Sequence, residues 1–142
     1  MVVEIMVGTL LCVQSVWDIK RKCIPSYITV LGAGVGVLCS IYKERSLVEV
    51  VLALLPGIMM LLLGKLTREA VGYGDGLLIT CLGTFYALED VAYVCMGAFL
   101  FAAGMALVML VFGNRRKEDS FPFVPFLFLG WILWLLLMKG VV

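Results

Sequence analysis

Six separate apolar runs constrain this chain more than any other feature. A helix needs about 20 mostly apolar residues to cross the hydrocarbon core, with a lower range near 17. The fifth run reaches that length alone, and the first three and the sixth reach it with their flanks. The sequence therefore predicts an all-α, polytopic membrane protein with six transmembrane helices. The runs are Val2–Trp17, Tyr27–Tyr42, Leu47–Gly64, Leu77–Leu88, Val91–Gly113 and Phe121–Met138.

Composition supports a single membrane-embedded domain over residues 1–142. The chain is 63% hydrophobic and 15% charged, whereas a soluble domain has about half apolar and a quarter charged residues. No polar segment is long enough to fold by itself. The net charge is +1 and no basic cluster exceeds three residues, so we expect no nucleic-acid partner. The first run opens with Glu4 and lacks a cleavage-site pattern, which favours a retained helix over a signal peptide.

The distribution of basic residues predicts the orientation in the membrane. Eight of them follow runs one, three and five, and three lie on the opposite side. By the positive-inside rule, the first set is cytosolic and both termini are outside. Asp18 opens the first cytosolic connection and Asp75 closes the second, so both acids are expected at the cytosolic face. The first set is Lys20, Arg21, Lys22, Lys65, Arg68, Arg115, Arg116 and Lys117, and the second is Lys43, Arg45 and Lys139.

The fourth run is short and follows a glycine-rich stretch, Gly72-Tyr73-Gly74-Asp75-Gly76. It reaches spanning length only if a glycine turn over Val71–Gly76 lies in or near the membrane. Non-helical backbone at that depth requires surrounding protein or a water-filled cavity. An acid placed there indicates a functional site. The alternatives are that Asp75 caps a helix and that Asp18, close to three basic residues, is a solvated charge.

Two carboxyl groups that converge in a low-dielectric site support acid–base chemistry. They cannot both ionise cheaply, so the pair shares one proton. The ionised member can activate water while the protonated member polarises a carbonyl, as in aspartic proteases. The chain has no His, no P-loop and no metal-ligand cluster, so we expect neither a cofactor nor a metal. Its five cysteines lack C-x-x-C spacing and are interpreted as structural.

Three short motifs occur in order along these runs: Asp18 followed by Ile24-Pro25, then Gly72-Tyr73-Gly74-Asp75, then Pro122-Phe123-Val124-Pro125-Phe126-Leu127. Together they resemble the first catalytic aspartate and its I/L-P turn, the G-x-G-D motif, and the P-F-G-P-F-L signature of a known family. That family comprises the membrane aspartic peptidases that process type IV prepilins and archaeal preflagellins. The resemblance runs from about Trp17 to Leu127.

The resemblance implies catalysis by Asp18 and Asp75. It also implies an active-site turn at Gly72, Gly74 and Gly76 that lies close to an extended substrate peptide. The implied substrates are pilin, pseudopilin or flagellin-like precursors, cut between a short basic leader and a hydrophobic helix at the cytosolic face of the cell membrane.

The chain also departs from the family pattern. Leu77 stands where the family commonly has Lys, Ser26 where Asn or Asp is common, and Val124 where the last signature has Gly. Between Asp18 and Tyr27 there is no room for the cytosolic insert with paired C-x-x-C motifs that is associated with N-methylation. The resemblance is therefore to the short, peptidase-only form.

Two other functions are possible for a membrane protein with these residues, but each explains fewer of the sequence features. A small proton- or cation-coupled transporter could employ both carboxylates, but such proteins commonly contain internal repeats, and the sequence shows none. A structural or assembly subunit would leave both acids and the glycine stretch without a role. The peptidase is therefore the favoured hypothesis, and the transporter is the alternative.

Overall fold

The computed structural model describes residues 1–21, 24–66, 72–112 and 122–140. Each helix in these ranges overlaps one of the six apolar runs, which confirms the all-α prediction. The elements are α1 (Val2–Arg21), α2 (Ser26–Tyr42), α3 (Leu47–Leu66), α4 (Tyr73–Phe85), α5 (Leu88–Phe112), α6 (Val124–Trp134) and the short π-helical η1 (Leu135–Lys139).

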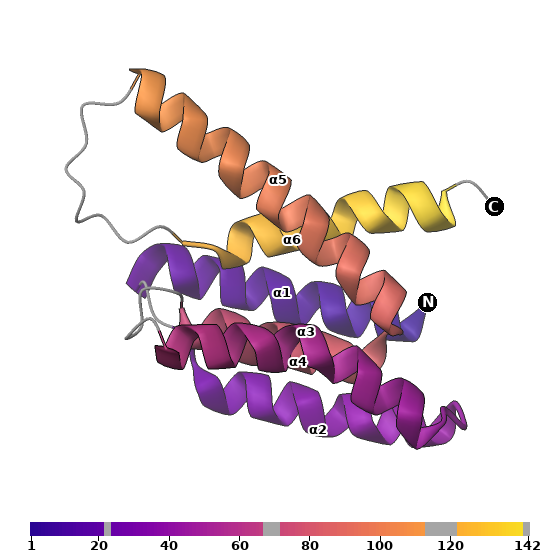
Figure 1. Cartoon of the computed structure of the whole chain (residues 1–142). Coiled ribbons are helices and arrows are strands. Elements are labelled where there is room, and N and C mark those ends of the chain that lie inside the picture. The colour runs from indigo at the N-terminus through magenta and orange to yellow at the C-terminus, as the bar shows by residue number, and fades with distance from the viewer. Residues whose placement is uncertain (22–23, 67–71, 113–121, 141–142) are drawn as a thin grey trace.

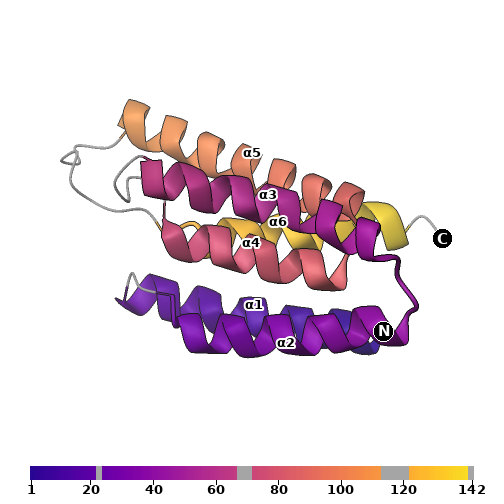
Figure 2. The same cartoon turned by 60° about the horizontal axis from the view of Figure 1, so that its bottom comes forward.

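Successive helices run in alternating directions along one bundle (Figures 1 and 2). The start of α1 and the end of α6 lie together at the right-hand end in Figure 1. The end of α1 and the starts of α4 and α6 lie together at the opposite end. This second end holds both acids that the sequence singles out.

Helix α4 is the central element of the bundle. Most of its residues from the second turn onward are buried, on every side of the helix, which is typical of a helix surrounded by protein. It packs between α2 and α3 and also contacts α5. Its short length of 13 residues fits this interior position. The buried residues are Gly76, Leu78, Ile79, Cys81, Leu82, Gly83, Thr84 and Phe85.

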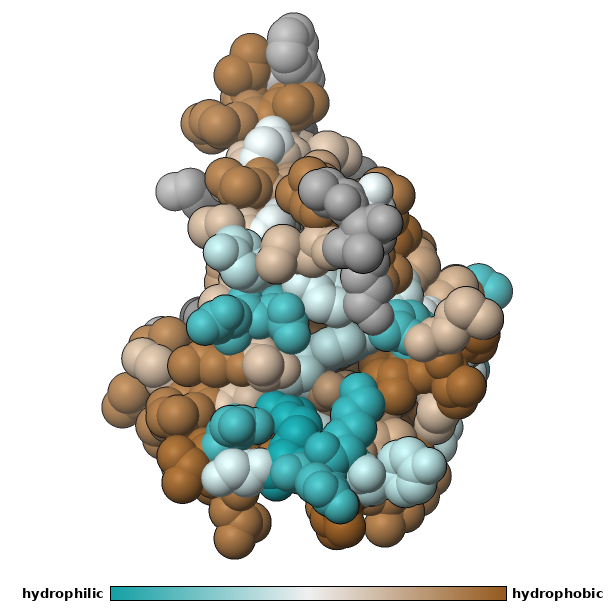
Figure 3. All heavy atoms as spheres, turned by 90° about the vertical axis from the view of Figure 1, so that its right-hand side faces the viewer, coloured by the Kyte–Doolittle hydropathy of each residue, from teal (hydrophilic) through white to brown (hydrophobic). Residues whose placement is uncertain are grey.

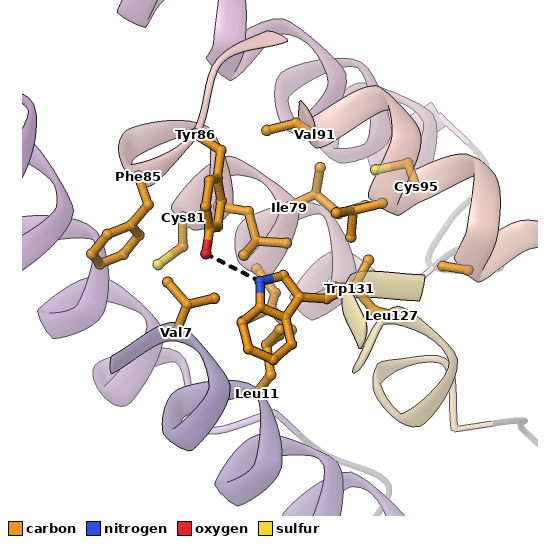
Figure 4. Close-up of a cluster of buried hydrophobic side chains, with 14 of the residues drawn as sticks. Val7, Leu11, Ile79, Cys81, Phe85, Tyr86, Val91, Cys95, Leu127 and Trp131 are labelled. Carbon is orange, nitrogen blue, oxygen red and sulfur yellow. Dashed lines mark hydrogen bonds between the residues drawn. The ribbon is translucent and has the colours of Figure 1, made fainter. Parts of the chain in front are cut away.

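The core joins α4 to the first and last helices (Figure 4). Val7 and Leu11 of α1 are buried against Ile79 of α4 in the same cluster. The indole Nε1 of Trp131, from α6, donates a hydrogen bond to the hydroxyl of Tyr86 across 3.1 Å. This bond satisfies two polar atoms in an otherwise apolar core, as buried Tyr and Trp require.

The far end of α4 is capped by a residue outside the helix. Arg45, in the connection between α2 and α3, donates to the carbonyl oxygens of Thr84 at 3.3 Å and Tyr86 at 3.0 Å. Ser40 of α2 also donates to the Thr84 carbonyl. The last carbonyls of a helix lack partners within it and carry partial negative charge, so a guanidinium stabilises this end.

The surface is that of a membrane protein. Three helices are long and apolar enough to cross a bilayer, namely Val2–Arg21, Leu47–Leu66 and Leu88–Val111. Ser26–Tyr42 and Val124–Met138 are apolar but shorter, so six complete crossings remain a prediction. Viewed from the right-hand end of Figure 1, hydrophilic side chains gather centrally and hydrophobic ones surround them (Figure 3). Large apolar side chains such as Leu62 and Leu110 are exposed along the bundle, as expected for surfaces that face lipid.

Candidate active site

Asp18 faces the interior of the bundle from the last turns of α1. Its residue exposure is only 7%. The buried residues of α1 are Val7, Leu11, Gln14, Ser15 and Asp18, a spacing that places them on one helical face. The structure therefore contradicts the alternative in which Asp18 is a solvated surface charge, although Lys20 and Arg21, in the same turn, are exposed.

The N-terminus of α6 points at Asp18. The backbone N–H of Val124 donates a hydrogen bond to Oδ2 of Asp18 across 3.2 Å. Pro122 and Pro125, on either side, have no N–H to donate. The next two N–H groups, of Phe126 and Leu127, bond instead to the carbonyl of Phe123 at 3.0 and 3.1 Å. Asp18 thus caps α6 from another helix, at the end where the helix dipole favours negative charge.

Asp75 lies in the first turn of α4 and is partly buried. The first turn of α4 and the last turns of α1, which carry Asp75 and Asp18, lie at the same end of the bundle (Figure 1). Two acids that are distant in sequence, on α1 and α4, therefore share one end of the bundle. The helix-start position also places Asp75 near the positive end of the α4 dipole.

The predicted glycine turn is wrong from Tyr73 onward, and Val71 lies outside the described residues. The N–H groups of Asp75 and Gly76 both bond to the carbonyl of Gly72, at 3.1 and 3.4 Å, which closes the first turn of α4. Gly72 is the N-cap, and no described glycine has a positive φ. Local helical hydrogen bonding therefore prevails over the flexibility of the glycines.

Close packing explains the need for glycine at two of these positions. A Cβ added to Gly74 would lie 2.8 Å from Cδ1 and 2.9 Å from Cβ of Ile24. A Cβ added to Gly76 would lie 2.8 Å from the backbone nitrogen of Leu61. The start of α4 is thus pressed against the Ile24-Pro25 segment on one side and against α3 on another. The contact between Gly74 and Ile24 joins the glycine-rich motif to the Asp18/Ile24-Pro25 motif. The Asp18–Val124 bond joins the Pro122–Leu127 motif to them.

Sequence reasoning missed the role of Val124. It placed Pro122–Leu127 at the start of the last helix without assigning it a contact. No residue type in the sequence signals this contact, because its donor is a main-chain N–H, which every residue except proline carries. Within the described residues, no group of three or more His, Cys, Asp and Glu side chains could hold a metal ion.

Comparison with known proteins matches this chain to leader peptidases, both by a family profile and by individual relatives. The sequence profile of the type IV leader peptidase family matches residues 5–108. The "Prepilin leader peptidase/N-methyltransferase" proteins of two strains of Burkholderia pseudomallei, 1026b and K96243, are each 30% identical over 127 residues. These alignments cover 84% of this chain and 41% of each relative, so the chain spans less than half the length of the curated relatives. No solved structure matches.

Proposed function

Because this chain belongs to the type IV leader peptidase family, we propose that it is a membrane aspartic endopeptidase that removes the leader peptide of prepilin-like precursors. The observation that carries the proposal is the placement of Asp18, buried near the end of α1, and Asp75, in the first turn of α4, at the same end of the bundle (Figure 1). The family match supports the peptidase over the transporter.

The proposed reaction is hydrolysis of one peptide bond by the two acids acting as a pair. The ionised carboxylate takes a proton from water as the water oxygen attacks the scissile carbonyl carbon, and the protonated carboxyl gives its proton to the carbonyl oxygen. The tetrahedral intermediate then returns that proton to the second acid. The first acid protonates the amide nitrogen, and the C–N bond breaks. The products are a new carboxyl terminus and a new amine, with both acids restored.

We assign the ionised role to Asp18 and the protonated role to Asp75. The N–H of Val124 can only donate, and a donor of this kind stabilises an ionised acceptor. A second negative charge nearby is unfavourable, so the shared proton resides on Asp75. The hydrogen bond also fixes the rotamer of Asp18, which keeps its second oxygen directed toward the attacking water.

The proposed active site opens at the cytosolic face, with both termini on the other side. The last turns of α1 and α3 carry basic residues, Lys20, Arg21 and Lys65, at the end of the bundle that holds the acids. Basic side chains at this boundary interact favourably with anionic headgroups of the cytosolic leaflet. A precursor with a hydrophobic helix in the bilayer would then present its leader junction at the depth of Asp18 and Asp75.

The test is cleavage of a defined precursor by the purified full chain in detergent or lipid nanodiscs. The substrate is a prepilin-like protein with a short basic leader and a hydrophobic N-terminal helix. Mass spectrometry of the products identifies the bond that is cut. We expect a single cut at the leader junction by the wild-type protein and no cut by the Asp18→Asn/Asp75→Asn double variant. Equal cleavage by both proteins would reject the aspartic mechanism, and no cleavage by the folded wild-type protein would reject this class of substrate.

A further inference from the structure

The buried face of α1 is polar over the turn that leads to Asp18. Gln14 is 0% exposed and Ser15 is 7% exposed, within a helix that is long and apolar enough to cross a bilayer. They lie four and three residues before Asp18, and residues at these spacings are neighbours on one helix face, with Cβ atoms about 5–6 Å apart. A polar strip therefore runs inward from the proposed catalytic acid.

Two atoms of this strip have no hydrogen-bond partner among the described residues. The Gln14 amide Nε2 donates to Oγ1 of Thr29 at 2.8 Å, but Oε1 of Gln14 and Oγ of Ser15 are buried and unpaired. Exchanging the amide oxygen and nitrogen of Gln14 would leave its NH₂ group unpaired instead. The unsatisfied atom therefore does not depend on which way the amide is oriented.

Unpaired polar atoms at this depth require an explanation. A buried polar atom that is left without a partner loses its hydrogen bonds to water and gains nothing in return. Buried polar side-chain atoms in proteins are otherwise paired with protein or with ordered water. Two such atoms on adjacent residues, one turn from an acid, make a suitable set of partners for a small polar molecule.

We propose that Gln14 and Ser15 bind buried water that replenishes the hydrolytic water of the Asp18–Asp75 pair. The Gln14 Oε1 accepts a hydrogen bond from such a water, and the Ser15 hydroxyl donates to it. The Val124 hydrogen bond engages Oδ2 of Asp18, which directs the water to the second oxygen, Oδ1. The supply role rests on the proposed peptidase function, whereas the presence of the water does not.

The first test is structural and independent of activity. A high-resolution structure of the wild-type chain in a lipid environment should contain an ordered water oxygen about 2.7–3.2 Å from both Gln14 Oε1 and Ser15 Oγ. The data are collected in sodium-free buffer containing N-methyl-D-glucamine. A dry site, with Gln14 and Ser15 bonded to other protein atoms, overturns the proposal. A site filled only when sodium is added overturns it also, because the same oxygens would then be cation ligands.

The second test compares two buried serines by the same substitution. Ser15→Ala removes one partner of the water, and Ser40→Ala, at the opposite end of the bundle, removes a partnered hydroxyl. We expect Ser15→Ala to lower kcat about tenfold with KM unchanged, as misplacement of a reacting group does. Gln14→Met should have a similar effect. Ser40→Ala should lower thermal stability but leave kcat within about twofold of the wild-type value.

The outcomes separate the two hypotheses. Unchanged kcat in both Ser15→Ala and Gln14→Met overturns the supply role, even if the wild-type protein cleaves its precursor. An equal loss of kcat in Ser15→Ala and Ser40→Ala overturns it also, since the effect would then follow from general destabilisation. Failure of the wild-type protein to cleave counts against the peptidase function alone, while the structural test still decides whether water occupies the site.

Discussion

The backbone N–H of Val124 donates to Oδ2 of Asp18 across 3.2 Å, although the two residues are 106 positions apart in the chain. This bond links the first and last helices at the level of the proposed catalytic acid. It gives the proline-flanked start of α6 a definite task, which is to present a main-chain donor to a buried carboxylate. Side-chain substitutions at Val124 leave this donor in place, so the bond must be tested through the backbone.

Replacing the Val124 amide with an ester should impair catalysis without unfolding the bundle. Incorporation of α-hydroxyisovaleric acid at position 124 keeps the side chain and removes the N–H. A hydrogen bond to a charged group contributes about 1.5–3 kcal/mol, so we expect kcat to fall about tenfold to a hundredfold. Leader cleavage is followed at saturating precursor. The matching ester replacement at Leu129, which is exposed on the same helix, serves as the control, and a loss of the same size in both proteins would assign the effect to general weakening of α6.

Asp18 and Asp75 should behave as one catalytic unit. Residues that act together show non-additive losses, so Asp18→Asn, Asp75→Asn and the double variant should each lose at least about a thousandfold in kcat/KM. Asp90→Asn is the matched control. Asp90 lies in the first turn of α5, at the opposite end of the bundle, and accepts a hydrogen bond from the indole of Trp134. Additive losses, or near-normal turnover of either single variant, would contradict a shared mechanism.

Gly74→Ala should inactivate the protein through a collision with Ile24. The new Cβ would lie 2.8–2.9 Å from Ile24 side-chain atoms, so the start of α4 must shift, and Asp75 shifts with it. Gly34→Ala is the control, because nothing lies within 4 Å of a Cβ at that position. Adding Ile24→Gly to Gly74→Ala removes both obstructing atoms, Cδ1 and Cβ of Ile24, and should restore part of the cleavage rate. Equal, small losses at both glycines would contradict this packing argument.

Arg45→Ala should destabilise the bundle from the end opposite the acids. The substitution leaves the carbonyls of Thr84 and Tyr86 without their guanidinium partner, which should lower the free energy of unfolding by about 1–3 kcal/mol. Thermal unfolding in detergent measures the loss, and Lys43→Ala, an exposed neighbour, is the control. An Arg45→Ala protein as stable as the control would mean that water satisfies these carbonyls equally well.

The proposed orientation can be tested by labelling one exposed position near the end of α1 and another just after the end of α2. In a background with all five cysteines replaced by alanine, Lys20→Cys should react with an impermeant maleimide only from the cytosolic side. Glu44→Cys should react only from outside. Both positions are exposed, so access depends on the side of the membrane. The reverse pattern would contradict the topology expected from the positive-inside rule and a cytosolic cleavage site.

Most helices were predictable from the sequence because apolar runs report directly on burial in lipid or protein. The first run was expected to end at Trp17, but α1 continues to Arg21. The polar residues after Trp17 predict a connection, but they form the last turn of α1, with Asp18 buried and Lys20 and Arg21 exposed. Hydropathy alone cannot distinguish a polar loop from a helical turn with one buried acid.

The candidate site was only partly accessible to sequence reasoning. Asp75 stands out by its glycine-rich setting, and the predicted topology and the motif resemblance pair Asp18 with it. The partner of Asp18, however, is a main-chain N–H, which no residue type reveals. The glycines at 72–76 suggested a turn because glycine tolerates many backbone conformations. In the structure, Gly74 and Gly76 instead allow close helix contacts, a property that depends on neighbours from other parts of the chain. Gln14 and Ser15 were not singled out, because two polar residues in an apolar run give no indication of whether they are paired.

The hydrogen bond between Val124 and Asp18 also sets the order of events during biosynthesis. At about 5–20 residues per second, a ribosome needs about 5–20 s to add the 106 positions that separate them. Throughout this interval α1 is already made while its donor is still unsynthesised. On the proposed mechanism, the nascent protease stays inactive until its last helix enters the bilayer. A ribosome-stalled intermediate that lacks α6 should therefore leave neighbouring precursors uncut.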